Sequence, residues 1–299
     1  MIEVIGSRTY RVRHRTSYEY GATMSDGYSV ACLVPRDTFR QRVVSSDVEV
    51  DPVPSEVDVT TDLFGNRVHQ FGLHEPHHEM VVEATSQVSI DLLADPVDDT
   101  PWERVAELGA SATGAQALEV GMFRSSSMLV DVDVLRRSLG SLTSRVFEPG
   151  RPIVDTARAL GREIHDTFEF DSSATTVSTP LVDVLEARRG VCQDFAHLAV
   201  GCLRSFGLAA RYVSGYIETI PPPGEERLVG ADASHAWVSV WTPHAGWVDF
   251  DPTNAHLPAN DHVTVAWGRD YADVIPVRGV MIGPIANQDL DVAVDVERI

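Results

Sequence analysis

Lysine is absent from the 299-residue chain, so all 24 basic residues are arginines, set against 44 acidic residues. The formal net charge is −20 at pH 7. Such a charge repels phosphate backbones and anionic lipid headgroups, which argues against a nucleic-acid partner and against binding to a membrane surface. A neutral or cationic partner is easier to accommodate. An aspartate-rich chain without lysine fits a salt-adapted source or the codon bias of a G+C-rich genome, and codon bias is the simpler explanation.

Cysteines and long apolar runs are also scarce. The three cysteines have no paired spacing, so the sequence does not indicate a disulfide framework, and a reducing compartment, the cytoplasm, is expected. No apolar run approaches the roughly 20 residues of a membrane helix. Residues 1–20 lack the apolar centre of a signal peptide. A hydrophobic content of 43% is enough for one large or two ordinary domains.

Cys192 stands at the start of a predicted helix. Apolar residues recur behind it at helical spacing as far as Phe206, and Gly207 is a suitable residue to follow the helix end. In a first turn, free backbone N–H groups and the positive end of the helix dipole favour a thiolate. Cys202, on the apolar face of this helix, and Cys32, in a strand region, are expected to be inert packing residues.

A histidine and a carboxylate follow on predicted strands. Three runs rich in Val, Tyr or Trp are bounded by Gly or Pro: residues 209–217, 235–242 and 247–251. The turn at residues 243–246 makes a hairpin of the last two runs, which can bring Asp251 alongside His235. Asp249 lies on the same face by alternation and is the alternative partner of the histidine. A cysteine, a histidine and a carboxylate together can form a nucleophilic triad.

These segments resemble the transglutaminase-like superfamily of bacterial and archaeal proteins. The matching stretches are residues 189–198, 210–216, 234–237 and 250–254. The resemblance implies a papain-like core in which Cys192 is the nucleophile, His235 is the general base and Asp251 orients the base. The backbone N–H of Cys192 is one expected oxyanion donor. The second donor is unassigned, because no tryptophan lies between Trp102 and Cys192.

The first part of the chain resembles the β-rich N-terminal region that accompanies this core in many bacterial members, notably at residues 35–37 and 62–66. The expected fold class is α+β, an N-terminal antiparallel β-sandwich followed by a papain-like transglutaminase core. The predicted units are a β-rich domain at 1–95, a mostly helical connection at 96–149, the catalytic core at 150–275, and C-terminal strands at 276–299 that dock on the sheets.

Other polar residues have simpler interpretations. The histidine-rich run 74–79 indicates a polar loop rather than a zinc site, because its proline disrupts regular ligand placement. His197 lies five residues after Cys192, a rotation of about 500° that puts it on another helix face, where packing is expected. Asp194 is expected to be a first-turn acid that suits the helix dipole. Four further histidines are expected at surface or loop positions: His165, His244, His256 and His262.

The sequence therefore predicts a cysteine-nucleophile enzyme that acts on amide bonds of a peptide or protein through an acyl-enzyme, without a metal or organic cofactor. Hydrolysis is favoured, because water is always available and nothing marks a dedicated amine site. Transglutaminase-type acyl transfer from glutamine to an amine is the alternative, and a non-catalytic peptide-binding module is the alternative from another class. The proline-rich, acidic residues 221–226 are interpreted as a solvated spacer or as a loop that helps select substrate. No oligomeric state is indicated.

Overall fold

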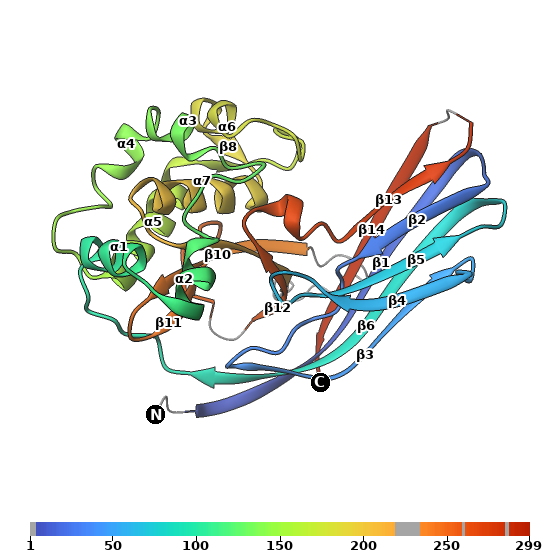
Figure 1. Cartoon of the computed structure of the whole chain (residues 1–299), viewed down its shortest axis with the longest axis horizontal. Helices are drawn as coiled ribbons and strands as arrows, with labels where there is room; N and C mark the ends of the chain where they lie inside the picture. Colours follow the sequence, from blue (N-terminus) through green and yellow to red (C-terminus); the bar gives the residue numbers. More distant parts are fainter. Residues whose placement is uncertain (1–3, 219–233, 259–260, 285–286) are drawn as a thin grey trace, which may run out of the picture.

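A strand of 21 residues, β1 (Val4–Met24), runs the length of the strand-rich unit of the molecule (Figure 1). The structure, a computed structural model, describes residues 4–218, 234–258, 261–284 and 287–299. Burial alternates along β1, with Tyr10 and Val12 inside, as expected for a strand with one covered face. β1 pairs antiparallel with β6 (His77–Leu93) and β14 (Gln288–Arg298), in a sheet of order β14-β1-β6-β3. The end of the chain thus returns to its first strand.

A second sheet faces the first. Its order is β13-β2-β5-β4. Its strands are β2 (Asp26–Ala31), β4 (Glu56–Thr61), β5 (Arg67–Leu73) and β13 (Val277–Ile282). Strand β3 (Gln41–Asp51) belongs to the first sheet. Buried side chains from both sheets form one cluster: Tyr20, Met24, Ala31, Leu33, Phe71, Leu73, Met80, Val82, Ala84 and Val277. The predicted α+β class with an N-terminal antiparallel β-sandwich is confirmed.

The other unit is built on a third antiparallel sheet, of order β11-β10-β9-β12. Its strands are β9 (Ala210–Ile217), β10 (Ser234–Thr242), β11 (Gly246–Phe250) and β12 (His262–Gly268). Helix α7 (Cys192–Ser205) packs against β9 and β10 and is surrounded by other helices (Figure 1). α7 ends as predicted, because Gly207 has a φ of 77° and its N–H donates to the Arg204 carbonyl.

The remaining helices lie between the sandwich and this sheet in the sequence. They are α1 (Trp102–Ala110), α2 (Gly114–Gly121), α3 (Val132–Arg136), α4 (Gly140–Thr143), α5 (Ile153–Thr167) and α6 (Leu181–Ala187). The unit also contains two short strands, β7 (Glu169–Phe170) and β8 (Arg189–Gly190), and a 3-10 turn, η1 (Tyr271–Asp273). The apolar stripe of α5 is buried. The connection at 96–149, predicted to be mostly helical, contains α1 to α4.

Two amide side chains of the strand-rich unit bind the backbone of β12, an edge strand of the third sheet. Gln41 donates to the Thr264 carbonyl (2.7 Å) and accepts from the Thr264 N–H (2.9 Å). Asn66 bonds Trp267 in the same way, at 2.8 and 3.0 Å. Both side chains are buried. Each therefore satisfies a backbone donor and a backbone acceptor that a neighbouring strand would otherwise bind.

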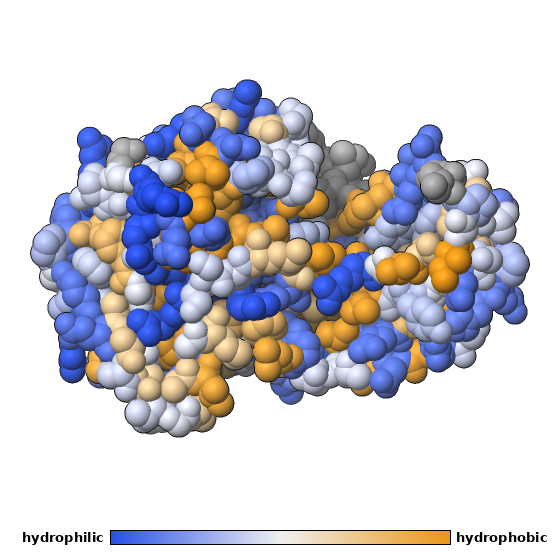
Figure 2. All heavy atoms as spheres, turned by 45° about the horizontal axis from the view of Figure 1, so that its top comes forward, coloured by the Kyte–Doolittle hydropathy of each residue, from blue (hydrophilic) through white to orange (hydrophobic). Residues whose placement is uncertain are grey.

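The surface is polar over much of the face drawn in Figure 2, where hydrophobic residues form separate groups among hydrophilic ones. No helix in the described part of the chain has the length and apolar character needed to span a bilayer. Residues 221–226 lie outside the described residues, so the interpretation of that loop is not tested.

Candidate active site

Cys192 is the first residue of α7, as predicted, and its side chain is partly exposed. The backbone enters the helix through a turn closed by Asp194, whose carboxylate accepts from the Val191 N–H (2.9 Å) and from the Thr175 hydroxyl (2.6 Å). Gly190 is needed there, because a Cβ would lie 2.6 Å from the Asp194 Oδ2 atom. Asp194 is therefore a buried capping acid, and burial raises the pKa of its carboxyl.

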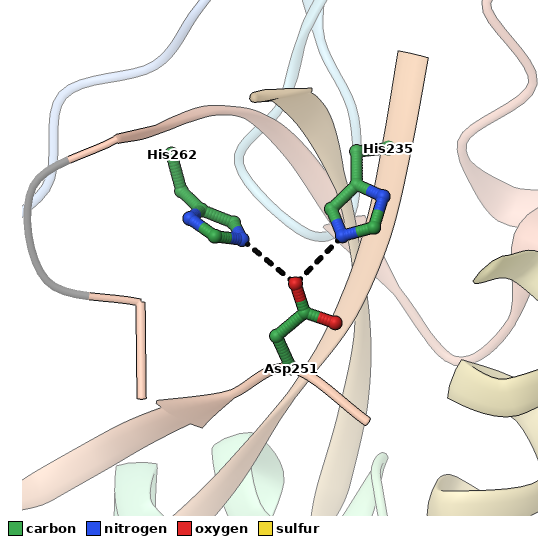
Figure 3. Close-up of side chains that lie close together, drawn as sticks. All are labelled: His235, Asp251 and His262. Atoms are coloured by element: carbon green, nitrogen blue, oxygen red, sulfur yellow. Dashed lines mark hydrogen bonds and ion pairs between the residues drawn. The ribbon is translucent and has the colours of Figure 1, made fainter. Parts of the chain in front are cut away.

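His235 lies near the start of β10, and the structure brings it to Asp251, as predicted. The distance between His235 Nε2 and Asp251 Oδ2 is 2.7 Å (Figure 3). Burial alone would lower the pKa of the ring, but hydrogen bonds with Asp251 and Cys192 outweigh it and raise the pKa to about 10. A carboxylate only accepts, so Nε2 carries a proton, and Nδ1 is the nitrogen left for Cys192. The arrangement favours a charged imidazole beside the thiol.

The carboxylate of Asp251 is fully buried and extensively bonded. Its Oδ1 accepts from the backbone N–H groups of Thr253 (2.8 Å) and Asn254 (3.2 Å). Its Oδ2 accepts from the Asn254 side chain (2.7 Å) as well as from His235. Although burial raises the pKa of Asp251, hydrogen bonds from His235 and His262 bring it well below its usual range. The group therefore stays ionised.

The expectation that His262 is a surface or loop residue is wrong. Its side chain is 3% exposed, and its Nε2 lies 3.0 Å from Asp251 Oδ2. His262 opens β12, which pairs with β9 and so carries the ring into the interior. The run of Val263, Val265 and Trp267 after it is a strand signal, but this signal does not show which face of the strand His262 occupies.

Asp249, the alternative partner of the histidine, takes a different position. Its Oδ2 accepts from the Trp237 indole at 3.2 Å, and the carboxylate bound to His235 is that of Asp251. The Trp237 ring is stacked on His235, with centroids 6.2 Å apart, and meets His262 edge-on at 4.9 Å. Trp237 thus packs against both imidazoles, a contact that the sequence analysis missed.

The remaining candidates behave as packing or surface groups. His197 is buried, accepts from the Tyr271 N–H (3.0 Å), and has a pKa lowered to about 4 by burial. Cys32 and Cys202 are buried packing residues, as expected, and burial raises the pKa of the Cys32 thiol to about 12 and that of Cys202 further. In the run 74–79, only residues 74–76 lie in a loop, because β6 begins at His77, and His74 bonds Asp26 (2.6 Å). Three histidines are exposed as expected: His165, His244 and His256.

Atoms able to bind a metal ion occur in His235, Asp251 and His262, all within 4.8 Å of one another. Both imidazole Nε2 atoms donate to the same carboxylate oxygen, so a cation there would have to displace two protons. It would also take the carboxylate that orients His235. The observed geometry is that of a hydrogen-bonded cluster.

Comparison with known proteins agrees with this fold and sequence pattern. Residues 10–89 match the bacterial transglutaminase-like N-terminal region, and residues 140–252, which include Cys192, His235 and Asp251, match the transglutaminase-like superfamily. Uncharacterized proteins of Mycobacterium tuberculosis and Mycobacterium leprae are 39% and 32% identical to the chain; each alignment covers 97% of this chain, and it covers 93% and 98% of the relative.

One further similar protein and one similar solved structure have names that describe an activity. A protein-glutamine gamma-glutamyltransferase of Pseudomonas aeruginosa is 33% identical over 111 residues, which are 36% of this chain and 17% of that protein. A crystal structure of a candidate cysteine protease from Cytophaga hutchinsonii superposes with a TM-score of 0.77 at 19% identity, covering 100% of this chain and 93% of that one. The second unit therefore has the predicted transglutaminase-like core, and the chain belongs to the transglutaminase-like superfamily, with the bacterial N-terminal region in front of that core.

Proposed function

We propose that this chain is a cysteine-nucleophile enzyme that cleaves amide bonds of a peptide or protein. Cys192 is the nucleophile, His235 is the general base and Asp251 orients the base. One observation supports this most strongly: the buried His235 ring is bonded to Asp251 at 2.7 Å, and the Cys192 thiol helps to raise the pKa of that ring. An imidazole between a thiol and a buried carboxylate is the arrangement that activates a thiol.

The reaction begins with the proton of Cys192 on His235, whose raised pKa favours the charged ring. The thiolate attacks the carbonyl carbon, and the Cys192 N–H, which has no acceptor within the helix, donates to the developing oxyanion. The C–N bond breaks as His235 gives its proton to the leaving amine, and a thioester remains. Water then adds while His235 takes a proton from it. The C–S bond breaks, which releases the carboxylic acid and restores the thiolate.

Hydrolysis is the proposed outcome, because water needs no dedicated site. Acyl transfer from glutamine to an amine uses the same first half-reaction, with an amine in place of water. The two named relatives support both outcomes, one being described as a candidate cysteine protease and the other as a protein-glutamine gamma-glutamyltransferase. The acyl acceptor therefore decides between them.

The partner in this proposal is a peptide or protein with a neutral or cationic sequence around the scissile amide, since the chain carries a net charge of −20. Nucleic acid and membrane surfaces are not proposed as partners. The proposed compartment is the cytoplasm, because a nucleophilic thiol must stay reduced to act. A peptide-binding module without catalysis would have no use for an imidazole with so high a pKa beside a thiol.

Trapping of the acyl-enzyme tests the proposal. The full chain is mixed with a peptide library, quenched in acid and measured by intact mass and peptide mapping, with Cys192→Ala as the control. We expect an acyl adduct on Cys192 that is absent from the control, and adducts of equal yield on both proteins would contradict the proposal. Repeating the reaction with a lysine-bearing peptide separates hydrolysis, which yields a free acid, from transfer, which yields an amine-linked product.

A further inference from the structure

A second imidazole lies behind the carboxylate of the proposed triad. His262 Nε2 is 3.0 Å from Asp251 Oδ2, and His262 Nδ1 is 2.7 Å from Asp261 Oδ1. Figure 3 shows His235 and His262 directed at the same carboxylate oxygen from two different strands. The ring of His262 thus spans two carboxylates, one of which holds the proposed base.

Hydrogen bonding fixes the position of this ring. A carboxylate oxygen only accepts, so a nitrogen of His262 that faces one is placed to donate to it. Burial raises the pKa of Asp251 and of Asp261, but hydrogen bonds from histidines bring both well below the usual range, so both are ionised. The ring is therefore held between two anions.

Aromatic and titratable groups surround the ring. Trp237 meets the ring edge-on, and the ring of His256 lies 5.4 Å away and is itself within 3.7 Å of Asp261. The charged and titratable groups that face or approach His262 from the surrounding elements are His235, Asp251, Asp249, His256, Asp261 and Arg40.

The strand that carries His262 is held from the other unit of the molecule. Thr264 and Trp267 of β12 are each bonded through both backbone polar groups, by Gln41 and Asn66 respectively. These side chains leave β12 little freedom to slide along β9. The strand-rich unit therefore adds to the pairing with β9 that holds the His262 ring in place.

We propose that His262 is a positioning residue: by bridging Asp251 and Asp261, it fixes the carboxylate that orients His235. This rests on the proposed function of Cys192 and His235. Asp251 is bonded from its own turn by Thr253 and Asn254, from β10 and from β12, and His262 supplies the β12 contact. Without it, the carboxylate could turn away from His235, and Asp261 would lose a hydrogen-bond partner.

The first test uses the unaltered protein. Nitrogen-15 NMR of the histidine side chains, with His262 assigned through a His262→Gln variant, reports the protonation of each ring nitrogen. We expect Nε2 of His262, the nitrogen that faces Asp251, to carry a proton that is hydrogen-bonded to that carboxylate. An Nε2 without a proton would overturn the proposal, and no variant needs to be active for this result.

The second test follows alkylation of Cys192 by iodoacetamide from pH 6 to pH 9 in the full chain. For His262→Phe we expect a rate at pH 7 about tenfold below that of the unaltered protein, the scale of one charge-assisted hydrogen bond, and a steeper rise with pH. His262→Gln, which keeps one N–H donor for Asp251, should recover most of the rate. The exposed His244→Gln serves as the matched control and should leave the profile unchanged.

The outcomes separate the two proposals. Fast alkylation in the unaltered protein with the same rate and pH profile in His262→Phe would overturn the role of His262 and leave the role of Cys192 intact. Alkylation of the unaltered protein no faster than that of free cysteine would overturn the proposed function itself, and with it the positioning role.

Discussion

An acid on the surface of the strand-rich unit and an acid buried in the core have different surroundings. In the strand-rich unit, acids and bases pair on the surface, as Arg13 does with Glu83 at 2.7 Å. In the core, Asp251 is 0% exposed and binds two imidazoles. An exposed pair gains little because water screens it, whereas a buried carboxylate is costly unless its partners are in place. The comparison teaches that the core holds the proposed chemistry and the other unit holds the core in position.

Removal of the strand-rich unit should have the largest effect. A chain of residues 96–299 keeps the helices and the third sheet, but β13 and β14 lose β2 and β1 as partners, and β12 loses Gln41 and Asn66. We expect no cooperative unfolding transition by circular dichroism. A truncated chain that unfolds cooperatively and alkylates Cys192 at the rate of the full chain would show that the core is independent.

Asp251→Asn should have the next largest effect, because an amide donates where the carboxylate accepts and so disturbs the protonation of His235. We expect acyl-enzyme formation to fall on the order of a thousandfold. Glu83→Gln is the matched control, since it removes a surface carboxylate from its arginine partner. If both substitutions lowered acyl-enzyme formation equally, the buried carboxylate would matter no more than a carboxylate in a surface ion pair.

Asn66→Ala tests how firmly the two units are joined. The substitution leaves the N–H and carbonyl groups of Trp267 without their partner. We expect the free energy of unfolding to fall by about 2–4 kcal/mol, measured by urea denaturation. Gln70→Ala, which removes an exposed amide on the adjacent strand β5, should change it far less. A comparable loss in both variants would show that the bonds to β12 are no stronger than a surface contact.

The smallest effect concerns pH. The pKa of His235 is raised in the folded chain, so its ion pair with Asp251 stabilises the fold fully below the unfolded value of about 6.5, and that contribution is lost as pH rises through the folded pKa. The comparison is made in a Cys192→Ala background, with and without His235→Gln. Cys192 is one cause of the raised pKa of His235, which is about 10 in the unaltered chain. In the Cys192→Ala background the contribution of the ion pair is therefore lost at a lower pH than this value. We expect the difference in unfolding free energy to shrink between pH 6 and pH 9, and a difference that grows over this range would contradict the assigned direction.

Much of this arrangement could be predicted because its signals are local. The helix after Cys192 and the hairpin after His235 follow from periodicity and turn residues, and the family motifs point to Asp251. The assignment of these three residues as catalytic remains a prediction that the structure is consistent with.

The missed residues depend on contacts distant in sequence. His262 reaches Asp251 only because β12 pairs with β9, and a single histidine at the start of an apolar run gives no sign of its partner. Gln41 and Asn66 look like ordinary residues near turns, although they bind backbone more than 200 positions away. Such polar contacts between distant segments leave no periodic trace in a sequence.

The central claim, that His235 activates Cys192, is tested most directly by the alkylation rate of Cys192 with iodoacetamide at pH 7. The unaltered chain should react faster than free cysteine, and His235→Gln should react on the order of a hundredfold more slowly than the unaltered chain. Peptide mapping would assign the label to Cys192, since Cys32 and Cys202 are buried. Equal rates for the two proteins would contradict the account.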